Sequence, residues 1–294
     1  MGPVRLTNHT GMSLRLNCER RADTPTILHP TLCVLPLRLL PGTNCGGRTA
    51  ARGRRTRPGG LTSAGVRRRE TAAVPDPHSA GADPTVAVSR GMRALLARRL
   101  AELAAGASPV GWKIGFNAPA IQQHFGLSGP VVGYLTDTGV SPDGATVGVS
   151  GWTAPAVEVE VALRVGERGE VAGLAPALEL VDLDLPFDDL EAILAGNVFQ
   201  RGVVFGPEVP GVDPWAVRVT VTKNGDVAAE GRLTEEPAAT AAVVRSFLDT
   251  HGSALAPGDR IIAGSMVAPV AVAPGDRLVV GFGPLGELRV GFGA

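Results

Sequence analysis

The chain has 294 residues, of which 44% are hydrophobic, and it carries 28 acidic and 28 basic residues. This composition allows a substantial buried core. No apolar run approaches the roughly 18 to 20 residues that a membrane span needs, which excludes a transmembrane helix. We therefore expect no membrane association.

The overall neutrality conceals a division near residue 84. Residues 1–84 contain 13 Arg and no Lys against 3 Asp and 2 Glu, a formal charge of +8, so the remainder carries −8. The first segment also contains none of the twelve aromatic residues. We expect residues 1–84 to be an Arg-rich disordered extension and residues 85–294 to form one folded domain. An upstream start or a reading-frame artefact would give the same pattern, and mass spectrometry of the native N-terminus would decide.

Two other interpretations of the leader are weaker. A nucleic-acid arm would use the cluster Arg52, Arg54, Arg55 and Arg57, but no aromatic residue is interleaved and no folded reader module follows. A secretory signal would need a charged start, an apolar middle and a small-residue cleavage site, in that order. The apolar stretch over residues 31–40 is short, is broken by Pro36 and Arg38, and lacks this order. We expect no nucleic-acid partner.

The three cysteines, Cys18, Cys33 and Cys45, match no common zinc spacing. Residues 85–294 contain no cysteine, which is typical of a protein of the reducing cytoplasm. We therefore expect a cytoplasmic protein.

From residue 84 onward the pattern becomes periodic. Apolar residues at helical spacing predict an amphipathic helix over residues 86–105. Residues 110–116 read as a short strand in which Lys113 is flanked by glycines. Asn117 is expected to cap a short helix that ends at Gly126.

Three glutamates interrupt the next apolar segments. Glu158 and Glu160 alternate with valines over residues 157–165, so a strand would place both carboxylates on one face. Glu179 lies within the apolar run 174–185 and needs a partner, because an unpaired buried carboxylate is costly. By spacing alone, the pair could be the solvated face of an antiparallel strand, and Arg201 could pair with Glu179. Alternatively, three hard oxygen ligands would suit Mg²⁺ or Mn²⁺.

The rest of the chain predicts short strands with few helices. Helices are expected over residues 188–194 and 237–250, and Asn224-Gly225 marks a tight hairpin between two strands. The sequence Ala-Pro-Gly-Asp-Arg occurs at 256–260 and again at 273–277, and both copies read as turns that feed strands of one sheet system. The pattern indicates an α+β fold.

Four motifs occur in an order that resembles a known family: Gly111-Trp-Lys-Ile-Gly115, Val157-Glu-Val-Glu160, Pro176-Ala-Leu-Glu-Leu-Val-Asp182, and Gly264-Ser265 with the following Ala268-Pro-Val and Pro274-Gly-Asp276. They resemble the 2-keto-4-pentenoate hydratases and 4-oxalocrotonate decarboxylases of the fumarylacetoacetate hydrolase superfamily. The resemblance covers roughly residues 85 to 294. It implies a mixed β-sandwich roll with flanking helices.

The same resemblance implies a site. Its metal, Mg²⁺ or Mn²⁺, would be held by Glu158, Glu160 and Glu179. Lys113 would be the active-site lysine, with a lowered pKa if it moves protons, and Ser265 would lie near the substrate. The expected activity is hydration of 2-hydroxy-2,4-dienoates in aromatic catabolism.

Departures from the family pattern leave alternatives open. Val131 and Val132 stand before Gly133, where characterised hydratases carry an acidic residue. A 4-oxalocrotonate-type decarboxylase would use the same metal and lysine, whereas an acylpyruvate hydrolase would need a well-placed His. His124 and His251 are both expected to be structural. A catalytically silent partner subunit is the alternative without enzymatic activity, and we expect a homo-oligomer or a complex with a related subunit.

Overall fold

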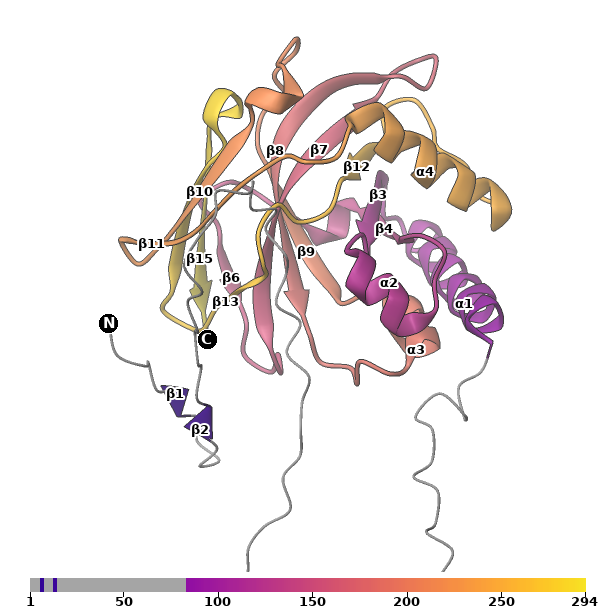
Figure 1. The fold of residues 1–294 in the computed structure, drawn as a ribbon, viewed down its shortest axis with the longest axis horizontal. Coiled ribbons are helices and arrows are strands. Elements are labelled where there is room, and N and C mark those ends of the chain that lie inside the picture. The colour runs from indigo at the N-terminus through magenta and orange to yellow at the C-terminus, as the bar shows by residue number, and fades with distance from the viewer. Residues whose placement is uncertain (1–5, 8–12, 15–82) are drawn as a thin grey trace, which may run out of the picture. The chain divides into compact units, whose positions relative to one another are not determined.

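A computed structural model describes residues 6–7, 13–14 and 83–294 (Figure 1). Within the N-terminal unit, β1 (Leu6–Thr7) and β2 (Ser13–Leu14) pair antiparallel. Apart from β1 and β2, the extension that the sequence predicts to be disordered lies outside the described residues, and so do the three cysteines. No described helix is long and apolar enough to cross a membrane.

The described residues contain four α-helices: α1 (Pro84–Ala104), α2 (Pro119–Phe125), α3 (Leu190–Ala195) and α4 (Pro237–Thr250). The Asp83 side chain caps α1 by accepting a hydrogen bond from the Thr85 amide, and proline at the first position suits a helix start. The predicted cap at Asn117 is wrong. The N-cap of α2 is Ala118, in extended conformation and without a side-chain bond, because the helix begins one residue later than expected.

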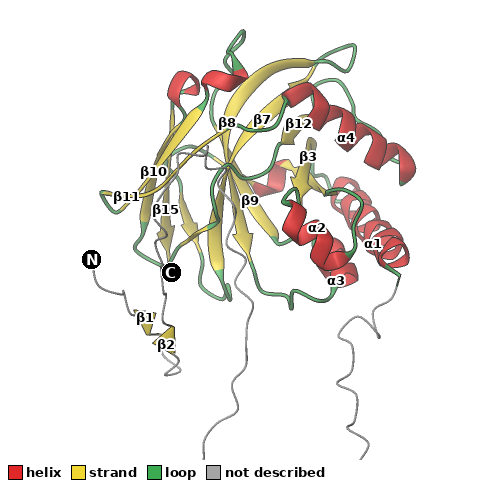
Figure 2. Ribbon diagram, viewed as in Figure 1, coloured by secondary structure: helices red, strands yellow, loops and turns green. Residues whose placement is uncertain are grey.

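The described strands beyond residue 83 form two sheets. The eight-stranded sheet contains β3 (Pro109–Gly115), β4 (Val131–Thr136), β5 (Val140–Ser141), β7 (Pro155–Val165), β8 (Val171–Asp182), β9 (Gln200–Phe205), β12 (Arg260–Ile262) and β13 (Val270–Ala271). The five-stranded sheet contains β6 (Thr146–Gly148), β10 (Arg218–Lys223), β11 (Asp226–Arg232), β14 (Arg277–Gly281) and β15 (Glu287–Gly293). Figure 2 shows α1 to α4 gathered beside the larger sheet, away from the smaller one. This arrangement confirms the predicted α+β roll with flanking helices.

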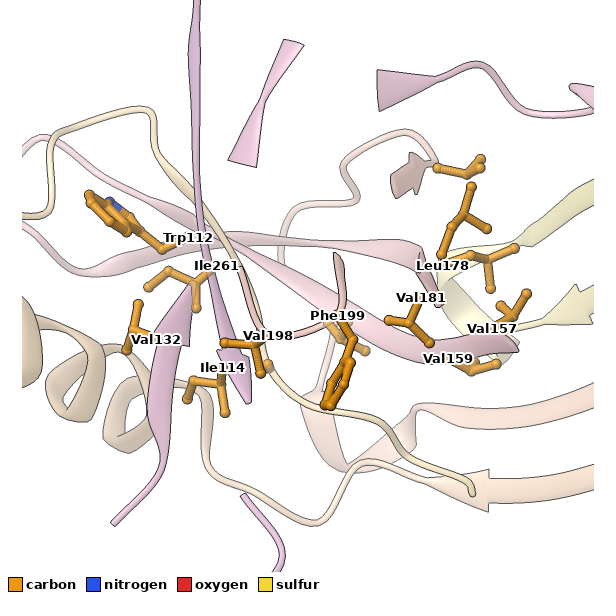
Figure 3. Close-up of a cluster of buried hydrophobic side chains, with 14 of the residues drawn as sticks. Trp112, Ile114, Val132, Val157, Val159, Leu178, Val181, Val198, Phe199 and Ile261 are labelled. Carbon is orange, nitrogen blue, oxygen red and sulfur yellow. The ribbon is translucent and has the colours of Figure 1, made fainter. Parts of the chain in front are cut away.

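The main core lies along β7 and β8. Val157, Val159 and Leu178 are fully buried, in the same cluster as Leu288 of the smaller sheet. Figure 3 shows the part of this cluster that runs from Trp112 on β3 to the β7 valines. Burying the odd-numbered side of β7 in the core turns the even-numbered glutamates to the opposite face.

Local turn chemistry is largely as predicted. Asn224 and Gly225 have positive φ values of 54° and 96° and join β10 to β11. Asp259 and Asp276 each accept a hydrogen bond from the amide of the residue three positions earlier, so the two turns are alike. The expectation that they feed one sheet is wrong. The first turn leads to β12 and the second to β14, which belong to different sheets, because the turn itself does not specify strand partners.

Candidate metal centre

Three carboxylates meet on the face of the larger sheet opposite the core. The antiparallel register places Glu158 of β7 directly across from Glu179 of β8, and Glu160 follows two residues along β7. Each residue offers an oxygen atom, and these oxygens lie within 4.8 Å of one another. Glu160 and Glu179 are fully buried, whereas Glu158 is only partly buried. Glu158 therefore marks the open side of the cluster.

Two of the buried carboxylate oxygens have no hydrogen-bond partner among the described residues. Glu160 Oε2 accepts a bond of 2.7 Å from the Gly264 amide, but its Oε1 is unpartnered. Glu179 Oε1 accepts from Lys113, and its Oε2 is unpartnered. Unsatisfied buried carboxylate oxygens are strongly unfavourable, and a hard divalent cation satisfies them well. The donor set therefore fits Mg²⁺ or Mn²⁺.

Lys113 lies beside these carboxylates. It is central in β3, where it pairs with Gly133 of β4 and Ile262 of β12, and it is only 1% exposed. Its Nζ donates hydrogen bonds to Glu179 and, at 3.0 Å, to the backbone oxygen of Val198. A lysine this deeply buried needs such partners.

The absence of a side chain at residue 133 makes this burial possible. A Cβ at Gly133 would lie 2.8 Å from Lys113 Cγ and 2.6 Å from Asn197 Oδ1. The neighbouring Val131 and Val132 are buried, so β4 brings no carboxylate to the lysine.

Burial dominates the protonation behaviour of the cluster. Desolvation raises the pKa of Glu160 well above its usual range, and the charges of Glu179 and Glu158 raise it further. Desolvation also raises the pKa of Glu179 to about 7, against the opposing effect of Lys113. Each of these shifts favours the neutral acid, because burial disfavours the charged carboxylate and one lysine offsets only part of the negative charge of the cluster.

The pKa of Lys113 departs from the expectation. Burial acts to lower it, but the negative charges of Glu179 and Glu158 outweigh burial, and the net pKa is raised. The lowered pKa that Lys113 would need in order to move protons is therefore not found. A divalent cation among the carboxylates would offset the negative charge that causes the rise.

Ser265 is bonded to the backbone. Its Oγ accepts a hydrogen bond of 3.1 Å from the Val159 amide and donates one of 2.8 Å to the Val267 oxygen. Val159 lies between Glu158 and Glu160, so Ser265 attaches its loop to β7 beside the carboxylates. The same loop supplies the Gly264 amide that contacts Glu160.

The other candidates lie elsewhere. Arg201 does not pair with Glu179; its guanidinium donates to Asp184 at 2.6 Å. Asp182 is buried but accepts bonds from the Thr153 and Ala154 amides, so it anchors the segment before β7.

His124 and His251, the two histidines among the described residues, make no hydrogen bond to Lys113 or to the three glutamates. The His124 ring stacks against Phe187, and its Nε2 contacts the Phe187 oxygen. His251 forms the C-cap of α4, as expected for a structural residue.

The segment 197–199 is a contributor that sequence reasoning missed. Its three residues have left-handed backbone, and the Val198 oxygen contacts Lys113. The available signal was Asn197, since asparagine tolerates this conformation better than most residues.

Comparison with known proteins places these features in context. No family model matches the chain. A 4-oxalocrotonate decarboxylase from Pseudomonas sp is 27% identical over 198 residues, covering 61% of this chain and 76% of the relative. A 2-keto-4-pentenoate hydratase from Paraburkholderia phymatum is 28% identical over 207 residues, covering 62% of this chain and 78% of the relative.

Solved structures agree on the fold. The 4-oxalocrotonate decarboxylase from Pseudomonas putida G7, complexed with magnesium and adipate, has a TM-score of 0.64 at 24% identity, covering 70% of this chain and 86% of that one. The fumarylpyruvate hydrolase from Pseudomonas aeruginosa, in complex with Mn²⁺ and pyruvate, has a TM-score of 0.51 at 19% identity, covering 63% and 89%. The chain is thus related in sequence to 4-oxalocrotonate decarboxylases and 2-keto-4-pentenoate hydratases, and it has the predicted fold of the fumarylacetoacetate hydrolase superfamily.

Proposed function

We propose that this chain is a metal-dependent hydratase of 2-hydroxy-2,4-dienoates, such as 2-hydroxypenta-2,4-dienoate, in aromatic catabolism. One observation carries the proposal: three carboxylates with oxygens within 4.8 Å of one another stand beside a lysine that is 1% exposed. The relationship to a named 2-keto-4-pentenoate hydratase supports the same reaction class.

Glu158, Glu160 and Glu179 would hold the cation, Mg²⁺ or Mn²⁺. When bound, it would supply Lewis-acid stabilisation of negative charge on the 2-oxygen and carboxylate of the substrate. The unpartnered oxygens of Glu160 and Glu179 support this assignment, because a cation would satisfy both. Ser265 and the Gly264 amide would keep Glu160 oriented.

Lys113 would move the proton. In ketonisation the 2-hydroxyl loses a proton and C5 gains one, which leaves a 2-oxo group conjugated to a C3–C4 double bond. Water then adds with its oxygen at C4 and a hydrogen at C3. Lys113 would carry this proton: as a neutral amine it would accept the proton of the 2-hydroxyl, and the ammonium so formed would donate one to C5, while the bonds to Glu179 and Val198 hold its nitrogen.

Aromatic rings lie next to both segments that meet at Lys113. Phe116 stacks on Phe125 with ring centroids 5.1 Å apart, and Phe187 lies 6.4 Å from Phe199 and 5.2 Å from Phe125. Phe116 follows β3, and Phe199 follows Val198. The stretches that carry these rings, 116–125 and 185–199, contain no Lys or Arg, and the Nε2 of their one histidine, His124, already contacts the Phe187 oxygen. An apolar substrate tail suits this wall better than a second carboxylate does.

Decarboxylation of a 4-oxalocrotonate-like diacid is the second candidate. It is favoured by the relationship to named 4-oxalocrotonate decarboxylases. It would use the same carboxylates and lysine, but it would also need a positively charged side chain to bind the distal carboxylate of the substrate.

One assay separates these reactions. The purified chain is incubated with 2-hydroxypentadienoate, 4-oxalocrotonate and an acylpyruvate, with EDTA and after restoration of Mg²⁺ or Mn²⁺. We expect metal-dependent loss of the dienoate chromophore, and we expect Glu158→Ala to abolish it. Release of CO₂ from 4-oxalocrotonate as the faster reaction would replace the hydratase by the decarboxylase. Unchanged activity in Glu158→Ala would remove the proposed site.

A further inference from the structure

The connection between α3 and β9 has an unusual backbone. Asn197, Val198 and Phe199 have φ values of 63°, 52° and 66°, so three successive residues with side chains are left-handed. This conformation is uncommon outside glycine and is an outlier for a β-branched residue such as Val198. Strain of this kind persists only where surrounding contacts enforce it.

The Asn197 side chain supplies those contacts. It is 2% exposed, and its Oδ1 accepts a bond of 2.9 Å from the Tyr134 amide while its Nδ2 donates one of 3.0 Å to the Tyr134 oxygen. The Nδ2 also donates to Gln200 Oε1 at 3.1 Å. One amide side chain thus ties the turn to the backbone of β4.

Two glycines leave the space in which the turn sits. A Cβ at Gly133 would lie 2.6 Å from Asn197 Oδ1, and a Cβ at Gly115 would lie 2.6 Å from Val198 Cγ1. Either side chain would displace the turn, since real Cβ contacts are longer than this. The position of the turn is therefore matched to β3 and β4, the strands that surround Lys113.

The turn orients the Val198 oxygen onto the lysine. Lys113 Nζ carries three hydrogens as an ammonium, and it donates to Glu179 and to the Val198 oxygen. No third partner is found in the described part of the chain. Two fixed partners leave one donor free, with its direction set by the other two.

We propose that Asn197 is a positioning residue that holds the Val198 oxygen against Lys113 and so aims the free N–H of the lysine at the substrate. The proposal rests on the proposed function for the proton transfer itself. The contact between turn and lysine can be tested separately, because Lys113 and Lys223 are the only two lysines of the sequence.

The test compares Asn197→Ala with a matched control, Asn224→Ala. Asn224 is also a left-handed asparagine, with φ 54°, and its side chain also makes hydrogen bonds, to Asp276 and Arg277, but it lies in the β10–β11 hairpin. In Asn197→Ala we expect kcat to fall roughly 10- to 100-fold while KM and the Mg²⁺ dissociation constant stay within about threefold. Asn224→Ala should leave kcat unchanged.

A second readout needs no activity. In protein labelled with ¹⁵N at lysine Nζ, the Lys113 signal should shift in Asn197→Ala, while the Lys223 signal stays in place. If Asn197→Ala does not fold, Asn197→Gly serves instead, because glycine adopts the left-handed turn without the side-chain bonds.

The outcomes separate the two proposals. If the wild type is inactive but the Lys113 signal shifts in Asn197→Ala, the proposed function is wrong, and the contact between the Asn197 turn and Lys113 is still supported. If the wild type is active and Asn197→Ala keeps both its kcat and its Lys113 signal, the positioning role of Asn197 is wrong. Equal losses in kcat, substrate binding and metal binding would also overturn it, because they would indicate general disruption.

Discussion

The buried carboxylates make a prediction about stability that can be tested without a substrate. Glu160→Gln replaces a carboxyl whose pKa is raised at a fully buried position, where one oxygen is unpartnered and two other carboxylates are near. Glutamine has the same shape, and its amide oxygen can still accept the bond from the Gly264 amide. We expect the metal-free variant to be about 1–3 kcal/mol more stable than the wild type at neutral pH, because the wild-type carboxyl must either bury its charge or bind a proton when the chain folds, and glutamine does neither.

Metal should reverse this order. A ligand that binds only the folded state stabilises it by about 2.7 kcal/mol at 100 times its dissociation constant. The wild type should gain this much when Mg²⁺ replaces EDTA, whereas Glu160→Gln should gain little, because a ligand of the cation is missing. The measurement is urea unfolding of both proteins in EDTA and in Mg²⁺.

A matched control keeps the interpretation specific. Glu230 on β11 is exposed, so Glu230→Gln should change neither the metal-free stability nor the response to Mg²⁺. A variant Glu160→Gln that is less stable than the wild type in EDTA, and that still gains stability from Mg²⁺, would refute the reasoning. The carboxylate would then be stabilising by itself and would not be a ligand.

Three further predictions concern the surroundings of the site and one distant turn. Gly133→Ala should destabilise the protein by about 1–3 kcal/mol, because its Cβ would meet Lys113 and Asn197. The control Gly281→Ala, whose Cβ would have no atom within 4 Å, should not destabilise it, and equal unfolding midpoints of the two variants would contradict the prediction. Ser265→Ala should lower the free energy of unfolding by about 1–2 kcal/mol, because two hydrogen bonds to the backbone are lost, and should change kcat less than about threefold. A much larger loss of kcat would mean that the hydroxyl takes a direct part in the chemistry. Burial acts to raise the pKa of Asp276, but hydrogen bonds from neighbouring donors lower it overall, so the folded pKa lies below the ordinary 3.8. Its stabilisation is present above that value and is lost as pH falls through the lower folded pKa. The difference in unfolding free energy between wild type and Asp276→Asn should therefore narrow below about pH 4, and a constant difference would contradict the shift.

Local patterns in the sequence determined much of what lies along the chain. Alternation placed Glu158 and Glu160 on one face of a strand, and β7 has that form because its odd-numbered valines are buried. Asn224-Gly225 specified its hairpin, since both residues accept a left-handed backbone. The helix that became α4 was predicted over its full length. Such features depend on neighbours within a few positions, and these are visible in the sequence.

The partners of the site were decided by tertiary structure. The register of β7 against β8 set Glu179 opposite Glu158, and parallel pairing of β3 with β12 brought Lys113 beside them. Arg201 was an equally reasonable partner for Glu179 by sequence, yet it pairs with Asp184. Strand pairing and turn handedness depend on contacts between residues far apart in the chain, which local periodicity does not encode. The left-handed turn at Asn197, which presents the Val198 oxygen to Lys113, is held by β4 and is visible only once the chain has folded.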